Sequence, residues 1–186
     1  MTSILKVDTI QDQSGNNIIN ENADTITIGA SGDTITVPSG ASMTGHNYPA
    51  FFGTQSSATS MTTGTFTKIQ IDTMTYDTHS AFDTTNNRFV VPSGKAGKYL
   101  FRAGIYTGAT LDGSYQSGIF YINGSIDNLS YSQQNITGAL SVVTNWSYIV
   151  DLSVGDYVEM YARHGNGTTL TAQTAYTSFQ GFRIGE

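Results

Sequence analysis

Two stretches near the start of the chain alternate strictly between apolar and polar residues. DTITI at positions 24–28 returns as DTITV at 33–37, and small residues and glycine follow each copy. This period of two predicts β-strands with one apolar face, formed by Ile26, Ile28, Ile35 and Val37. Two such strands make a hairpin at most, and an isolated hairpin is only marginally stable in water. The apolar face therefore needs a partner beyond the repeat.

From about residue 46 the pattern changes to short apolar or alternating runs, separated by turn sequences such as SGKAG, LDGS, INGS and HGNG. No run has the 3.6-residue apolar period of a helix. Phe179 and Phe182 flank Gly181, which predicts a kink or bulge in the last strand. We expect an antiparallel β-domain over residues 46–186, preceded by a separate N-terminal segment, 1–45. The expected strands span 48–53, 66–71, 87–91, 97–106, 116–122, 142–151, 155–164 and 178–184.

The composition supports an all-β chain: 38% of the 186 residues are hydrophobic and only 12% are charged, with 20 glycines and 11 tyrosines. The formal net charge is -6 and the eight Lys and Arg residues are scattered, so the chain lacks the basic patch that nucleic-acid binding needs. It also lacks an apolar run long enough to cross a bilayer. The opening MTSILKVDTIQDQ does not have the pattern of a signal peptide. We therefore expect synthesis in a cytoplasm, a soluble product and no membrane insertion.

Residues 50–186 resemble the C1q/tumour-necrosis-factor (C1q/TNF) jelly rolls in motif order. The stretch from Ile71 to Phe89, IDTMTYDTHSAFDTTNNRF, has the spacing of that family's signature. Gly97, Tyr99 and Phe101 stand as its G-x-Y-x-F motif. LSVGDYVEMYA at 152–162 and FQGFRI at 179–184 are similar to its later strands. Ile71 and Ala103 stand where the family prefers aromatic residues.

The resemblance implies a jelly-roll sandwich that forms a threefold trimer with both termini close together at its base. Three copies of residues 23–45 held side by side would bury the Ile26, Ile28, Ile35 and Val37 faces against one another, as stacked repeats do. Since the chain has no cysteine and therefore no disulfides, oligomerisation is also the expected source of rigidity.

The N-terminal sequence SILKVDTIQDQSGNN is similar to the starts of tail-fibre and other virion structural proteins of bacterial viruses. This resemblance is short and of low complexity. It implies that the N-terminal segment attaches the protein to another virion protein, of the tail or of the capsid. The apolar residues expected to make that attachment are Ile4, Leu5, Val7 and Ile10.

Enzymatic and metal-dependent functions find little support. The chain has no G-x-S-x-G nucleophile motif and no carboxylate pair that spacing alone identifies as a glycosidase dyad. We therefore expect no catalytic residues. His46, His79 and His164 are not at close ligand spacing, so we also expect no metal centre. Calcium stays an open alternative, because some C1q-like trimers carry it and because aspartates occur in the loops. These aspartates are Asp112, Asp127, Asp151 and Asp156.

The loops 107–117 and 123–140 are the expected binding surface, because they combine aromatic rings with Gly, Ser and Asn. Trp146, by contrast, is expected in the core. The candidate receptor-binding residues are Tyr106, Tyr115, Tyr131, Asn123 and Asn128.

Three hypotheses follow for the function. The first is a non-enzymatic homotrimeric virion protein of a bacteriophage, an appendage whose jelly roll binds a host-surface glycan or protein. The second is a capsid decoration or cement protein that the N-terminal segment anchors on the shell. The third is a soluble C1q-like lectin or signalling module, which the missing secretion signal disfavours.

Overall fold

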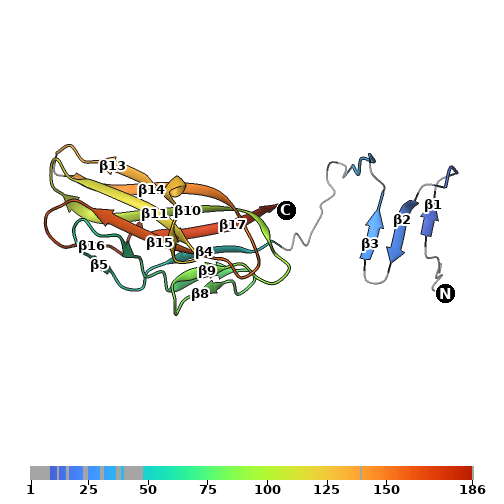
Figure 1. Cartoon of the computed structure of the whole chain (residues 1–186), viewed down its shortest axis with the longest axis horizontal. Coiled ribbons are helices and arrows are strands. Elements are labelled where there is room, and N and C mark those ends of the chain that lie inside the picture. The colour runs from blue at the N-terminus through green and yellow to red at the C-terminus, as the bar shows by residue number, and fades with distance from the viewer. Residues whose placement is uncertain are drawn as a thin grey trace. The chain divides into compact units, whose positions relative to one another are not determined.

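The computed structural model of the chain describes residues 9–11, 13–15, 17–22, 25–29, 32–36, 39, 48–138 and 140–185 (Figure 1). The chain divides into two compact units, residues 1–46 and 47–186. We call the second unit the C-terminal domain. The strands of the first unit, which we call the N-terminal sheet, are β1 (Thr9–Gln11), β2 (Asn17–Asn22) and β3 (Thr25–Ile28).

The N-terminal sheet is antiparallel with the order β1-β2-β3. Ile10 pairs with Ile19, and Ile19 pairs with Ile28. Paired residues of antiparallel strands project from the same face, so these three isoleucines form one row across the sheet. Ile26 lies two residues from Ile28 and therefore shares that face. All four are exposed within the chain, with Ile26 at 67% and Ile28 at 55%.

The prediction that both repeat copies are strands of one hairpin is wrong. The first copy contains β3, which pairs with β2 rather than with the second copy. Residues 33–36 of the second copy form no strand. The physical reason is that β2 already supplies backbone partners to β3, while Gly29 and Gly32 adopt φ of 82° and 96°, which ends the extended conformation.

The C-terminal domain contains two large antiparallel sheets (Figure 1). One has five strands in the order β14-β10-β17-β4-β7. Its longest pair, β10 and the edge strand β14, is in register from Gly97 opposite Leu152 to Tyr106 opposite Val143. The strands of this sheet are β4 (Ala50–Thr54), β7 (Thr73–Asp77), β10 (Gly97–Thr110), β14 (Leu140–Leu152) and β17 (Ser178–Gly185).

The second sheet has seven strands, with the path β12-β11-β15-β9-β8 and with β13 on β11 and β6 on β15. A 3-10 helix, η1 (Asn128–Ser130), follows β12, and β5 (Thr59–Met61) pairs with β16 (Leu170–Ala172) in a small separate sheet. The seven strands are β6 (Thr67–Lys68), β8 (Phe82–Asp83), β9 (Arg88–Val90), β11 (Tyr115–Ile122), β12 (Ser125–Ile126), β13 (Ser132–Asn135) and β15 (Tyr157–His164).

The core of the C-terminal domain is a cluster of aromatic rings contributed by both large sheets. The fully buried Phe101 ring has centroid distances of 5.4 Å to Phe89, 6.0 Å to Phe120 and 5.9 Å to Phe179. Trp146 is buried beside Phe120, as expected. Tyr99 is also buried, and its hydroxyl donates to the Lys95 carbonyl at 2.6 Å. Burial raises the pKa of Tyr99 to about 12.

The all-β antiparallel architecture is confirmed, and each expected strand has a counterpart. Several short strands were not expected, among them β5, β12 and β13. The predicted bulge at Gly181 is wrong, because Gly181 pairs regularly with Phe101 and the register shifts instead between Lys98 and Tyr99. A β-carbon on Gly181 would lie 2.6 Å from the Phe101 ring, so the glycine leaves space for an aromatic side chain.

Candidate functional site

The solvent side of the five-stranded sheet carries a set of large apolar side chains. In β17 the alternation directs Phe179 into the core and Phe182 to the outside, where Phe182 is 47% exposed. In β14 it directs Trp146 inward and Ile149 outward, at 57% exposed. We call these exposed side chains the apolar face: Tyr76, Val143, Ile149, Phe182 and Ile184.

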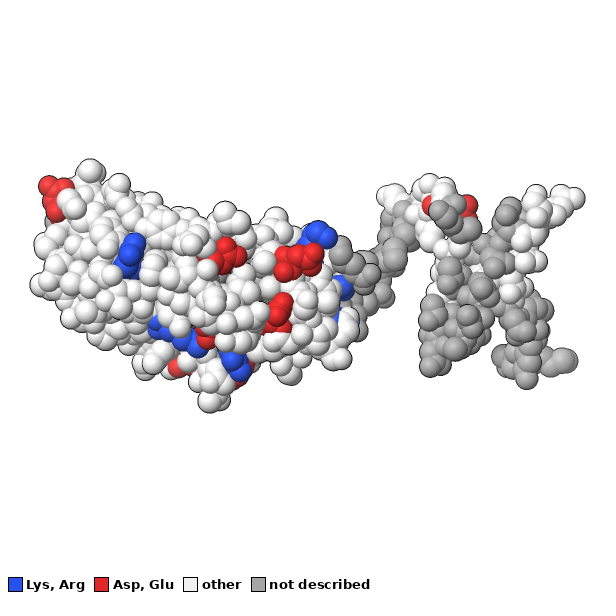
Figure 2. Space-filling view, in the orientation of Figure 1, with Lys and Arg blue, Asp and Glu red and all other residues white. Residues whose placement is uncertain are grey.

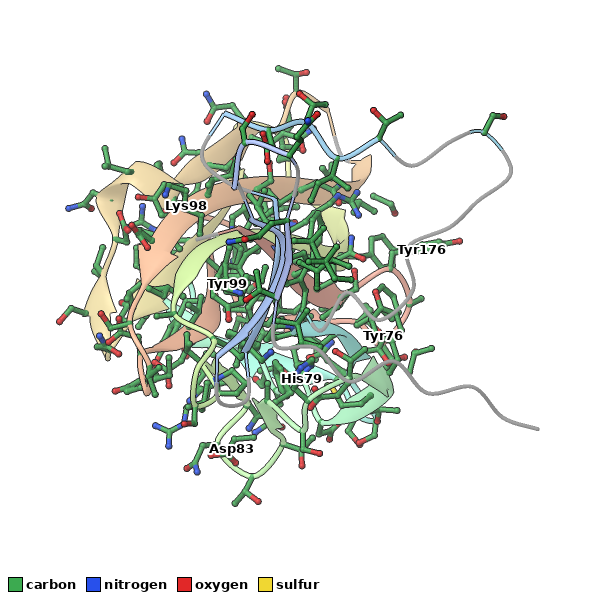
Figure 3. The ribbon with its side chains drawn as sticks, turned by 90° about the vertical axis from the view of Figure 1, so that its right-hand side faces the viewer. Tyr76, His79, Asp83, Lys98, Tyr99 and Tyr176 are labelled. Carbon is green, nitrogen blue, oxygen red and sulfur yellow. The ribbon has the colours of Figure 1, made fainter. Side chains whose placement is uncertain are left out.

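A hollow lies within the apolar face between Tyr76 and Phe182. Leu100, Arg102 and Gln180 complete its rim. The Tyr76 ring stacks against Phe52 of the neighbouring strand, with ring centroids 6.4 Å apart, which holds Tyr76 at the edge of the hollow. Figure 3 shows Tyr76 at the periphery of the domain and Tyr99 inside it. A hollow with a mostly apolar rim and a few polar groups is a surface suited to a side chain from another subunit.

Charge is sparse on this side of the sheet. Lys98 and Asp151 are opposite each other in the register at one end of the β10–β14 ladder, and Arg102 donates a hydrogen bond to Asn145 Oδ1 at 3.1 Å. Figure 2 shows, on the face in view, charged side chains scattered over an otherwise uncharged surface. The apolar face therefore loses little charge solvation when it is covered.

Tyr106, a candidate receptor-binding residue, lies in β10 of the five-stranded sheet. Its ring packs edge-on against Tyr176, with centroids 5.6 Å apart. Tyr176 is exposed in the connection before β17 and lies at the periphery in Figure 3. The structure therefore separates Tyr106 from the other candidates, which belong to the seven-stranded sheet and its connections.

Tyr115 and Tyr131 come together around one residue that the sequence analysis missed, Arg163. The Arg163 guanidinium lies 5.5 Å from the Tyr115 ring centroid, and its Nη2 donates to the Tyr131 hydroxyl at 3.3 Å. The alternation of YVEMYARH in β15 was a usable signal, because it directs Tyr157, Glu159, Tyr161 and Arg163 to the side of the sheet that faces away from the core.

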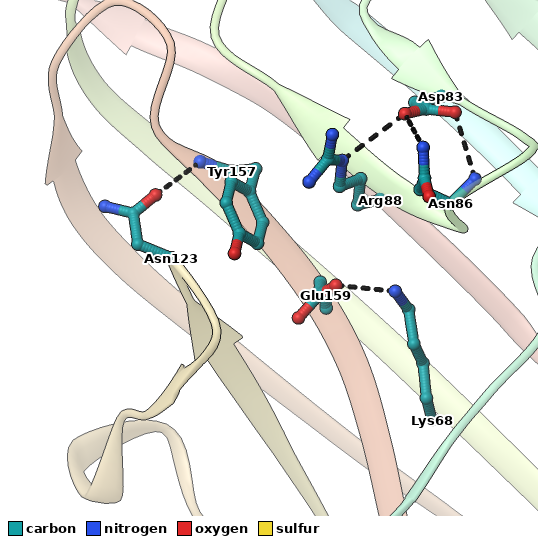
Figure 4. A network of polar contacts seen from close by, with 7 residues as sticks. All are labelled: Lys68, Asp83, Asn86, Arg88, Asn123, Tyr157 and Glu159. Carbon is teal, nitrogen blue, oxygen red and sulfur yellow. Dashed lines mark hydrogen bonds and ion pairs between the residues drawn. The ribbon is translucent and has the colours of Figure 1, made fainter.

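Asn123 and Asn128 occupy turn positions. Asn123 has φ of 52° between β11 and β12, and its side chain accepts from the Tyr157 amide at 2.9 Å (Figure 4). The same side chain donates to Asp156 at 2.8 Å. Asn128 is exposed at the start of η1. These contacts give Asn123 a structural role in joining two turns.

The expectation that 107–117 is a loop is wrong. β10 extends to Thr110 and β11 starts at Tyr115, which leaves only a tight connection. The carbonyl of Ile136 and the side chain of Asn166 hold this connection by accepting from the amides of Gly113 and Leu111. In the segment 123–140, β12, η1 and β13 occupy half of the expected loop.

Solved structures with the same sandwich include a complement 1qA domain and murine APRIL. The globular domain of zebrafish complement 1qA superposes with a TM-score of 0.54 and 14% identity, covering 74% of this chain and 98% of that one. Murine APRIL at pH 5.0 gives 0.55 and 12%, covering 74% and 99%. The C-terminal domain has the C1q/TNF jelly-roll fold. Identities this low show the fold alone, and no family model matches the chain.

Two proteins of Bacillus subtilis (strain 168) are similar in sequence. The chain is 34% identical over 115 residues to the uncharacterised protein YqcC, covering 56% of this chain and 30% of YqcC. It is 32% identical over 110 residues to the phage-like element PBSX protein XkdV, covering 56% of this chain and 16% of XkdV. The chain therefore spans less than a third of either relative.

The residues expected to pack or attach outside the jelly roll are only partly described. Ile26, Ile28 and Ile35 are exposed, and Ile10 lies in the same isoleucine row as Ile28. If Ile10 takes part in attachment, it would therefore do so through the same face of the N-terminal sheet that carries the isoleucine row. Four further residues lie outside the described part of the chain: Ile4, Leu5, Val7 and Val37.

Three of the four aspartates considered for calcium accept hydrogen bonds from backbone amides, and the fourth, Asp151, lies opposite Lys98 in the β10–β14 pair. Asp112, Asp127 and Asp156 accept from the backbone amides of Gly138, Leu129 and Ser153 at 2.6, 3.0 and 2.7 Å. Within the described residues no three His, Asp or Glu side chains are placed to share a metal ion. His46 lies outside this part. Nor does the described part contain a helix long and apolar enough to cross a membrane.

Proposed function

We propose that this protein is a non-enzymatic structural protein of a bacteriophage that forms a homotrimer. The apolar face of the jelly roll is the observation that carries the proposal, because it leaves Phe182, Ile149 and Tyr76 exposed in a single chain. Similarity to the phage-like element protein XkdV supports the phage context. The jelly-roll fold supports the trimer, which the resemblance to C1q/TNF proteins implied.

The physical case for association is the area of apolar surface that the single chain leaves in water. Fully burying a large aliphatic or aromatic side chain contributes about 1.5–3 kcal/mol. Five such side chains on a surface with few charges favour contact with another copy. A contact between different patches of identical subunits closes into a ring when the rotation allows, and we propose that three subunits close it.

The N-terminal sheet supports the same assembly. Its isoleucine row, Ile10, Ile19 and Ile28, needs a partner that the described residues of its own unit do not supply. Three rows that meet around a threefold axis would form a shared core. In the trimer we propose, the N-terminal segment attaches to a neighbouring virion protein, and the jelly rolls bind a glycan or protein on the host surface.

Sedimentation equilibrium of the full chain tests the trimer. At micromolar concentration we expect a mass three times that of the 19.9 kDa chain. The double variant Phe182→Glu/Ile149→Glu should sediment as a single folded chain, because each change places a charge on the apolar face without touching the core. Val154→Glu, at an exposed apolar residue in the β14–β15 turn, is the matched control and should leave the mass unchanged. A wild-type chain that is single and fully ordered would refute the proposal.

A further inference from the structure

The solvent side of the seven-stranded sheet carries a second group of aromatic rings, outside the core. Tyr121 in β11 and Tyr161 in β15 stack face to face, with centroids 3.8 Å apart. Phe66, which precedes β6, meets both Tyr121 and Tyr131 edge-on at 6.4 Å. We call this group the aromatic platform: Phe66, Tyr115, Tyr121, Tyr131 and Tyr161. Its members come from segments far apart in the sequence, so the fold itself assembles the surface.

Arg163 lies among these rings without a counterion in the described structure. Its guanidinium is 4.5 Å from the Phe66 ring centroid and 5.5 Å from that of Tyr115. The Nε–H is enclosed and finds no acceptor, and Nη2 donates only to the neutral Tyr131 hydroxyl. A half-buried guanidinium close to two aromatic rings, with one N–H already bonded, can present its remaining N–H groups as a fork to an anionic group.

The cations beside Arg163 differ from it, because each has a carboxylate. Lys68 Nζ lies 2.5 Å from Glu159 Oε1, and Arg88 Nε lies 3.3 Å from Asp83 Oδ2 (Figure 4). Among the described carboxylates, none forms an ion pair with Arg163. The sheet therefore neutralises its other cations internally and leaves one positive charge open for a ligand.

The surroundings of Arg163 favour an acidic sugar over other kinds of anion. The Tyr131 hydroxyl bonds to Gln133, which in turn donates to Asn135 at 2.9 Å, so amide and hydroxyl groups border the rings. A pyranose ring has C–H faces that lie well against aromatic rings and hydroxyls that bond to such amides. A nucleic acid would need several open cations, which a chain with a net charge of -6 does not offer here.

We infer that the aromatic platform around Arg163 binds an acidic saccharide, whose carboxylate pairs with the guanidinium while a sugar ring lies against Tyr115 and Tyr131. The inference deepens the proposed host-surface role and rests on it. Its geometry is compatible with the trimer, because the platform belongs to the seven-stranded sheet and the apolar face to the five-stranded sheet. Gly165 allows the arrangement, since a β-carbon there would overlap the Tyr115 ring.

Isothermal titration of the full chain with oligosaccharides tests the inference. The acidic probes are oligogalacturonate and hyaluronan hexasaccharides and oligosialic acid; maltohexaose and cellohexaose are the neutral probes. We expect at least one acidic probe to bind and the neutral probes to bind about tenfold or more weakly, because charge-assisted hydrogen bonds are the stronger ones. The absence of binding to all acidic probes at millimolar concentration, or equal binding of neutral probes, would overturn the inference.

Variants locate the site. Arg163→Gln should weaken binding of the acidic probe about tenfold or more, and Arg163→Lys should weaken it less, because it keeps the charge but loses the fork. Arg88→Gln, a paired cation on the same sheet, is the matched control and should bind like wild type. Unchanged binding by Arg163→Gln would refute the site. Tyr131→Ala removes one ring of the site and should also weaken binding. Thermal unfolding of each variant shows whether a loss of binding comes from loss of the site or from loss of the fold.

Failure here and failure of the trimer are distinguishable on the same samples. A chain that sediments as a trimer but binds none of the acidic probes refutes only the saccharide site. A single chain that binds through Arg163 refutes only the trimer. Titration is expressed per chain, so oligomeric state does not alter the stoichiometry.

Discussion

At the scale of single residues, strands of the jelly roll and core rings approach one another most closely where a glycine stands in place of a residue with a side chain. Gly118 in β11 faces the Trp146 ring of the opposite sheet, and a β-carbon there would overlap that ring. A β-carbon on Gly181 would likewise overlap the ring of Phe101, its partner on the neighbouring strand. Protein interiors are close-packed, so even one added carbon is felt at such positions.

Gly118→Ala should destabilise the jelly roll by about 1–3 kcal/mol, because Trp146 must move in a core that has no room for it. Urea unfolding followed by Trp146 fluorescence, the signal of the single tryptophan, measures the loss. Gly185→Ala is the matched control in a strand, since no atom lies near the added carbon. Equal stability of the two variants would contradict the packing argument.

The same scale shows what the sequence could reveal about the candidate sites. Alternation correctly separates Phe179 from Phe182 and Trp146 from Ile149, so the apolar face was predictable strand by strand. The contact of Arg163 with Tyr115 and Phe66 was not predictable, because it depends on β6, β11 and β15 pairing in one register. Gly181 shows the opposite error: a glycine that makes space for Phe101 has the same sequence signature as one that permits a bulge.

At the scale of elements, long strands were predictable and short ones were not. β10, β14 and β15 have enough alternating residues to define a period. β6, β8 and β12 have two residues each and are strands only because a neighbour supplies hydrogen bonds. The two repeat copies show the same dependence on a neighbouring strand, since nearly identical sequences differ in structure when only one of them has a paired neighbour.

The N-terminal sheet gives a test at this scale. Ile19→Thr/Ile28→Thr places hydroxyls in the isoleucine row while keeping β-branched residues that suit strands. If three rows share a core, the change removes about 1.5–3 kcal/mol for each fully buried side chain. We expect limited proteolysis to cut the variant before residue 47 much faster than wild type. Ile126→Thr, at an exposed residue of the C-terminal domain, should be cut like wild type. Equal cutting of all three would contradict a shared core.

At the scale of the whole molecule, the chain combines a domain with its own aromatic core and a sheet whose isoleucines remain exposed. The order of motifs from Ile71 to Ile184 was sufficient to predict the fold, because a jelly roll constrains which strands follow one another. The place that the protein would take in a phage particle, if the proposed function holds, was not predictable. Attachment depends on the surface of another protein, and nothing in this chain records that surface.

Counting copies per particle separates the two virion hypotheses. For the appendage that we favour, a quantitative gel of purified virions should give a few trimers per particle. A capsid decoration protein would instead be present in amounts comparable with the major shell protein. The known copy number of that shell protein calibrates the gel. A result of the second kind would assign the protein to the shell and leave the trimer intact.

The isoleucine row has a consequence for the order of events during synthesis. Residues 9–28 leave the ribosome before any of the jelly roll, so in the proposed trimer these strands wait for partners that exist only after three complete chains have met. The polar residues that alternate with the isoleucines, and the small number of strands, limit premature pairing of the exposed edges. In the proposed trimer the C-terminal domain therefore sets the order of assembly. Its folding brings three chains together, and the N-terminal strands, although they are made first, pack against one another last.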